Sequence, residues 1–142
     1  MAGGFELDRF LPYRLSALSS RVSREFSVIY RDMLGISNAE WRVLAHLSAS
    51  GAVSVRDIHL RAGLEKSKAS RAAARLEGTG LVEKKADERD GRLVALTLTE
   101  AGEAAMAELI PLARAYEAEL LARLDAEDRA AFDRIVSRLG GP

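Results

Sequence analysis

The stretch LEKSKASRAAARLEGTGLVEKKADERDGRLVALTLTEAG, residues 64–102, decides the fold. Its first part has the apolar spacing of a helix with small residues on its inner face, and Gly78 and Gly80 end that helix. Two short β-type runs follow, and the second, residues 92–99, alternates apolar and polar side chains. The charged segment between the runs contains one glycine, Gly91, which suits the tip of a hairpin. The sequence therefore predicts a helix followed directly by a two-stranded hairpin.

The chain before this stretch is predicted to be helical. Apolar residues from Leu7 to Met33 recur at intervals of three or four, which indicates one long helix ending at Gly35. Ser37 and Glu40 have the spacing of a capping box, in which a serine hydroxyl and a glutamate satisfy free N–H groups at a helix start. A second helix is therefore expected to begin just after Ser37.

A third, short helix completes the pattern before the basic helix. The segment Ser54-Val55-Arg56-Asp57 is a weaker capping box, and Gly63 marks the end of the helix that follows it. After the hairpin, Thr99 is expected to cap a long helix to about Arg123, and Asp125 to cap the last helix. A short helix, a glycine-containing turn and a basic helix form a helix-turn-helix. The predicted fold is mainly α with a small β-hairpin wing, a winged helix-turn-helix with six helices.

Charge is unevenly distributed along the 142 residues, although the net charge is zero. Residues 54–75 contain six basic and two acidic side chains, a net charge of +4, and residues 100–142 contain nine acidic and five basic ones, a net charge of −4. The basic segment could meet phosphates while the acidic segment stays in solvent. The chain has no cysteine, no apolar run long enough for a membrane span and no secretory signal, so a cytoplasmic protein without a metal or cofactor is expected.

The outer face of the predicted basic helix carries the candidate DNA contacts. Lysine and arginine near the start of a recognition helix can bind guanine edges in the major groove, and further along they bind phosphates. The alternative interpretation is an ordinary solvated helix face. The short helix and turn that precede the basic helix favour DNA binding over this alternative. The candidates are Lys66, Ser67, Lys68 and Arg71 for the groove, with Ser70 and Arg75 for phosphates.

The charged hairpin tip has two interpretations. One is a wing whose arginine enters the minor groove, where the negative potential is strong; Arg89 is the first candidate, Asp87 would brace it, and Arg92 is the other arginine. The other is a charged surface hairpin whose ion pairs each contribute less than about 1 kcal/mol. The sequence does not decide between Arg89 and Arg92.

The motif Asp-x-Arg-x-x-Arg followed by Leu-Thr-x-x-Gly resembles the wing signature of the MarR family of winged-helix regulators. Here it reads Asp87, Arg89, Arg92 and then 98–102. SRAAARLEGTGLVEK is similar to the family's recognition helix, and NAEWRVLAHL to its preceding helix. The resemblance implies a homodimer formed by the first helix, in residues 1–35, and the last two, in residues 100–142. Residues 36–99 would form the DNA-binding lobe.

The resemblance also implies a repressor that binds double-stranded DNA at a pseudo-palindromic operator and is released by a small aromatic or phenolic acid. By position, Arg14, Trp41 and His46 are candidates for that ligand site. Each has a simpler explanation, because Arg14 could form a salt bridge across the dimer, Trp41 could be a core residue and His46 could lie satisfied between helices. No nucleophile motif or phosphate-binding glycine loop indicates an enzyme. The other hypothesis is a winged-helix protein-interaction module that does not bind DNA sequence-specifically.

Overall fold

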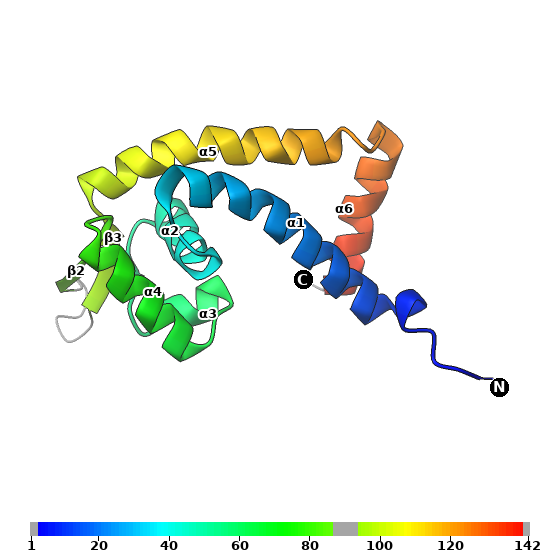
Figure 1. Cartoon of the computed structure of the whole chain (residues 1–142), viewed down its shortest axis with the longest axis horizontal. Helices are drawn as coiled ribbons and strands as arrows, with labels where there is room; N and C mark the ends of the chain where they lie inside the picture. The colour runs from blue at the N-terminus through cyan, green and yellow to red at the C-terminus, as the bar shows by residue number, and fades with distance from the viewer. Residues whose placement is uncertain (1–2, 87–93, 141–142) are drawn as a thin grey trace. The chain divides into compact units, whose positions relative to one another are not determined.

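The computed structural model describes residues 3–86 and 94–140. The chain divides into two compact units, Met1–Leu109 and Ile110–Pro142, which are described separately. Along the chain, the elements are the 3₁₀ turn η1 (Leu7–Arg9), α1 (Leu11–Leu34), α2 (Asn38–Ser50), β1 (Val53–Ser54), α3 (Ile58–Ala62), α4 (Lys66–Gly78), β2 (Val82–Ala86), β3 (Val94–Leu98), α5 (Glu100–Leu121) and α6 (Ala126–Gly140) (Figure 1). The predicted fold class, mainly helical with a β-hairpin wing, is confirmed.

The first long helix begins later than the apolar stripe predicts. Leu7–Arg9 forms η1, Phe10 is extended, and α1 starts at Leu11. Pro12 explains the delay, because proline has no N–H to donate and its ring collides with the carbonyl four residues earlier. The predicted end is confirmed: Gly35 adopts a left-handed conformation with φ of 65° and donates its N–H to the carbonyl of Arg31.

Aromatic rings attach the second half of α1 to α2. The ring of Trp41 lies 4.9 Å from that of Phe26 and stacks at 5.8 Å on that of Tyr30. The amide of Asn38 donates to the Tyr30 hydroxyl at 3.2 Å. The serine half of the predicted capping box at α2 is present, because Ser37 Oγ accepts from the N–H of Glu40 at 3.2 Å. Among the described residues, the Glu40 carboxylate does not return the bond and pairs with Arg75 instead.

The sheet has three strands, not the two predicted. Its order is β1-β3-β2, and Val53 pairs with Leu96 in an antiparallel ladder. The predicted start of the third helix at Ser54 is therefore wrong, because the backbone of Ser54 belongs to the ladder. Its hydroxyl accepts from the N–H of Arg56 within the turn, and α3 begins only at Ile58.

Small side chains on the inner face of α4 allow it to lie close to α2, as the sequence predicts. The buried residues of α4 are Ala69, Ala72, Ala73 and Leu76, and those of α2 include Val43, Leu44 and Leu47. Removing this apolar surface from water stabilises the lobe by about 25 cal/mol per Å². The solvent face of α4 is thereby left to polar and charged residues.

The start of α5 is joined to the end of α4 through Thr99. Its hydroxyl donates to the carbonyl of Gly80 at 2.6 Å and accepts from the N–H of Gly102 at 3.0 Å. Its own N–H donates to the carbonyl of Leu81 at 3.0 Å. The predicted cap at Thr99 is confirmed, and it also fixes the chain between the basic helix and the hairpin.

In the second unit, α6 begins with the predicted cap, since Asp125 Oδ1 accepts from the N–H of Asp128 at 2.8 Å. Large apolar side chains of this helix are exposed: Phe132, Ile135, Val136 and Leu139. Within the described residues, no helix is long and apolar enough to cross a membrane.

Candidate nucleic-acid interface

The turn between α3 and α4 is built on Gly63. This residue has φ of 66°, a left-handed conformation that glycine adopts without steric cost, and its N–H is directed to the carbonyls of His59 and Leu60. Arg42 of α2 donates from Nη1 to the carbonyls of Ala62 and Gly63, at 3.4 and 3.3 Å. Helix α2 therefore fixes the turn from which α4 starts.

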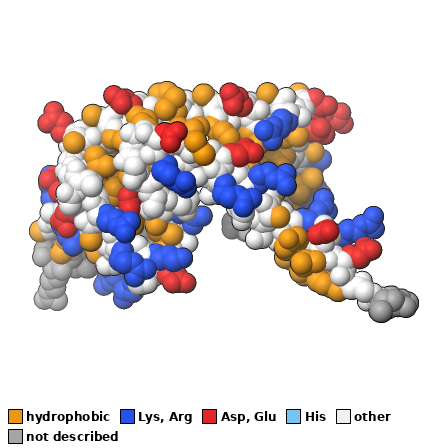
Figure 2. Space-filling model, in the orientation of Figure 1, with side chains coloured by type: hydrophobic (Ala, Val, Ile, Leu, Met, Phe, Trp, Pro, Cys, Tyr) orange, Lys and Arg blue, Asp and Glu red, His pale blue; other side chains and the backbone are white. Residues whose placement is uncertain are grey.

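The predicted DNA contacts of α4 all lie on its solvent face. The exposed residues are Lys66, Ser67, Lys68, Ser70, Arg71 and Arg75. Figure 2 shows lysine and arginine side chains gathered over the region of α3 and α4. A basic, exposed face of this kind attracts the phosphates of nucleic acid.

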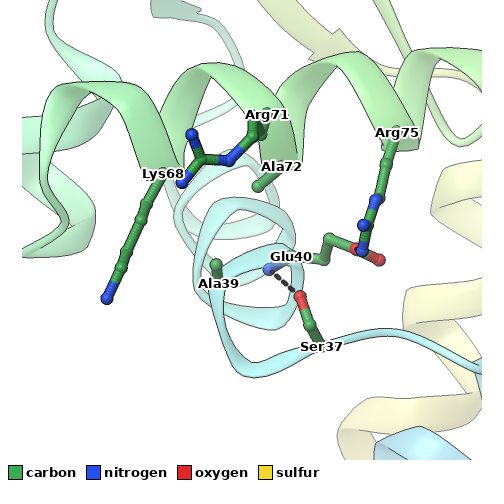
Figure 3. A pocket seen from close by; sticks show the side chains of 7 residues that line it. All are labelled: Ser37, Ala39, Glu40, Lys68, Arg71, Ala72 and Arg75. Atoms are coloured by element: carbon green, nitrogen blue, oxygen red, sulfur yellow. Dashed lines mark hydrogen bonds and ion pairs between the residues drawn. The ribbon is translucent and has the colours of Figure 1, made fainter.

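A shallow pocket of about 120 Å³ lies between α4 and the start of α2. Its lining residues are Ser37, Ala39, Glu40, Lys68, Arg71, Ala72 and Arg75 (Figure 3). Arg75 Nη1 lies 3.5 Å from Glu40 Oε1. Among the described residues, neither Lys68 nor Arg71 has a side-chain hydrogen bond or ion pair, so both are available to an anion.

Two contacts of α2 were not predicted. The sequence predicts only a capping-box role for Glu40, yet its carboxylate is paired with Arg75, and Arg42 holds the turn before α4. Both partners are more than 20 residues away along the chain. Because no local spacing relates residues so far apart, the sequence offers no signal for either contact.

The predicted hairpin is confirmed at its base. Strands β2 and β3 are antiparallel, with Val82 opposite Leu98 and Ala86 opposite Val94. Lys84 Nζ of β2 lies 3.7 Å from Glu77 Oε1 of α4. This ion pair connects the hairpin to α4. The predicted wing residues Asp87, Arg89 and Arg92 lie outside the described residues.

The predicted ligand residues lie in different places. Arg14 is exposed on α1 and helps to line a groove of about 460 Å³ formed by η1 and α1. Trp41 is half-buried against the rings of Phe26 and Tyr30, and His46 is half-buried on α2. Neither Trp41 nor His46 lines the groove that contains Arg14.

A short helix, a left-handed glycine turn, an exposed basic helix and an antiparallel hairpin together define a winged helix-turn-helix DNA-binding protein. A model of the MarR family matches residues 34–93. An HTH-type transcriptional repressor of Mycobacterium tuberculosis is 31% identical over 132 residues, which cover 92% of this chain and 91% of the relative. The chain belongs to the MarR family of transcriptional regulators.

Solved structures agree with this assignment. A MarR family transcriptional regulator from Silicibacter pomeroyi is 26% identical and superposes with a TM-score of 0.82, covering 97% of this chain and 92% of that one. The PcaV transcriptional regulator of Streptomyces coelicolor, solved in complex with its natural ligand, is 25% identical with a TM-score of 0.74, covering 99% and 97%. These similarities extend over nearly the whole chain.

Proposed function

We propose that the protein is a cytoplasmic, ligand-responsive repressor that binds a pseudo-palindromic operator as a homodimer. DNA binding is supported above all by the two faces of α4: Ala69, Ala72, Ala73 and Leu76 are buried, whereas the predicted DNA contacts are exposed. Near the start of α4, Lys66, Ser67, Lys68 and Arg71 would enter the major groove, and Ser70 would bind phosphate. Repression is supported by the name of the mycobacterial relative.

Dimerisation would cover apolar surface that a single chain leaves in water. On α1, the side chains of Leu11, Leu15 and Leu18 are exposed, and α6 exposes four large apolar side chains. Several large apolar side chains exposed along one helix are typical of a protein interface. We therefore assign residues 1–35 and 100–142 to the dimer and residues 36–99 to the DNA-binding lobe. A two-fold dimer would place its two α4 helices on half-sites about one helical turn apart.

The proposed effector is a small aromatic or phenolic acid. PcaV supports a small-molecule ligand, because that regulator was solved with its natural ligand. The aromatic or phenolic class is what the family resemblance implies. Arg14 could pair with the ligand's carboxylate from the groove on α1. Trp41 and His46, which do not line this groove, would need to contact the ligand from another part of the site. The ligand can shift DNA binding only by the difference in its affinity for the two states of the dimer.

The salt dependence of DNA binding tests the proposal. After the bound sequences have been selected from random duplex DNA, the affinity for the best sequence is measured from 50 to 200 mM salt. A regulator that neutralises several phosphates should give a steep, linear log–log slope. Repeating the selection with a panel of aromatic acids tests release. A flat slope would instead indicate a protein-interaction module.

The base-reading role of α4 has its own test. Lys68→Ala or Arg71→Ala should change the base preference at one operator position, with a cost of about 1–3 kcal/mol for the preferred base. A loss that is uniform across all sequences would assign the altered side chain to phosphate instead. The readout is the selected sequence of each variant compared with that of the wild type.

A further inference from the structure

We propose that Glu40 is a positioning residue that holds Arg75 against α2 and makes the Arg75–Glu40 pair electrically neutral toward DNA. The positive charge that this pocket presents to DNA then comes from Lys68 and Arg71. The inference rests on the proposed function, DNA binding through α4. It gives Arg75 a different role from the phosphate contact that the sequence predicts.

The burial of Glu40 is the first step. Its side chain is only 9% exposed, and its partner Arg75 is 74% exposed at a separation of 3.5 Å. A carboxylate at this depth has lost most of its water, so it depends on a charged partner. Among the described residues, Arg75 is the only ion-pair partner of Glu40.

The position of Glu40 is fixed by its own helix. Its N–H donates to Ser37 Oγ at 3.2 Å, so Glu40 lies in the capped first turn of α2. The cap fixes the backbone of Glu40, and the short side chain keeps the carboxylate close to the first turn of α2, so the carboxylate cannot accompany Arg75 out toward a ligand. Figure 3 shows that the long Arg75 side chain reaches from α4 to Glu40 instead.

A phosphate arriving at the pocket would meet three cations in different situations. Moving Arg75 to a phosphate would leave the buried carboxylate of Glu40 without a partner, and a buried unpaired charge is energetically unfavourable. Lys68 and Arg71 can contact an anion without breaking an ion pair. In Figure 3 the Lys68 side chain points away from Glu40. Because the salt-dependent part of DNA binding follows the phosphates that are neutralised, a pair with zero net charge adds little to it.

The test compares log–log salt slopes of duplex DNA binding. Glu40→Gln keeps the size of the side chain and an oxygen that can accept from Arg75, but it removes the negative charge. We expect Arg75 to act as a free cation in this variant, with tighter binding to all sequences and a slope steeper by about 0.9. The double variant Glu40→Gln/Arg75→Gln should return to the wild-type slope. The control is Glu103→Gln, an exposed acid of α5 that does not line the pocket, which should leave the slope unchanged.

Two results would overturn the inference while leaving the proposed function intact. One is a wild-type slope for Glu40→Gln with a slope about 0.9 shallower for the double variant, because Arg75 would then already neutralise a phosphate in the wild type. The other is equal steepening by Glu40→Gln and Glu103→Gln, which would be a general effect of charge. Circular dichroism checks that each variant is folded, and if Glu40→Gln is not, the slope of the double variant decides alone. A flat slope for the wild type overturns both proposals.

Discussion

Gly102 occupies a position where no side chain fits. A Cβ atom added there would collide with the carbonyl oxygen of Leu81 and press on the side chain of Leu98. The same Leu81 carbonyl accepts from the N–H of Thr99, so it cannot move away without losing that hydrogen bond. The glycine of the Leu-Thr-x-x-Gly motif is therefore explained by the close approach of α5 to the chain between α4 and β2.

Gly102→Ala should lower the free energy of unfolding by about 1–3 kcal/mol, because the backbone of Leu81 has to shift. Thermal or urea unfolding followed by circular dichroism measures the change. The matched control is Gly78→Ala, because a Cβ there meets nothing within 4 Å. Alanine also favours helix over glycine by up to about 1 kcal/mol, so the control should be neutral or stabilising. Equal stability of the wild type and Gly102→Ala would contradict the packing argument.

The hairpin is the element through which the predicted wing would reach DNA. Its base is anchored on both sides, because β3 pairs with β1 as well as with β2. A hairpin whose strands are already fixed at the base has less conformational entropy to lose when it binds DNA. The base of the hairpin thus suits a wing that presents one arginine, whichever of Arg89 and Arg92 it is.

Arg89→Ala should weaken operator binding by about 1–3 kcal/mol and leave dimer formation unchanged, since the minor groove attracts an inserted arginine. Fluorescence anisotropy with a labelled operator measures the affinity, and sedimentation measures the assembly. Arg9→Ala, which removes a positive charge from η1, serves as the control and should change the affinity little. Wild-type affinity for Arg89→Ala would exclude this arginine from the groove, and Arg92→Ala would then be the variant to measure.

Exposed apolar side chains distinguish the first and last helices from the DNA-binding lobe. Leu15 on α1 is 51% exposed and lies among other exposed leucines, whereas Leu60 on the short α3 is 72% exposed. An isolated exposed leucine is common on protein surfaces, but a row of them along one helix indicates a partner surface. Replacing Leu15 by glutamate should therefore weaken the dimer, whereas the same replacement at Leu60 should not.

Sedimentation at micromolar concentration should give a dimer of about twice 15.4 kDa for the wild type. Leu15→Glu should shift it toward monomer, because a buried unpaired carboxylate is costly at an interface. Leu60→Glu introduces the same charge on α3 and should stay dimeric. A monomeric wild type, or equal behaviour of the two variants, would contradict the proposed dimer through α1.

Local patterns in the sequence were sufficient for most of the helices, their caps and the hairpin. Ser37, Thr99 and Asp125 cap helices as their spacing predicts, because a cap depends on residues within one turn. The apolar period likewise identified the buried face of α4, since helical geometry alone determines which residues share a face. The family resemblance also came from short motifs of this kind.

Contacts between distant segments were decided only by the tertiary structure. The pairing of Ser54 with Ala95 turned an expected helix start into a strand, and the Glu40 carboxylate, expected to close a capping box, pairs with Arg75 instead. Periodicity reports on neighbours within a few residues, whereas strand pairing and buried ion pairs depend on which surfaces meet after folding. The sequence by itself therefore determined the winged helix-turn-helix and its basic helix. The tertiary structure decided that Arg75 is paired with Glu40, whereas Lys68 and Arg71 have no ion pair among the described residues.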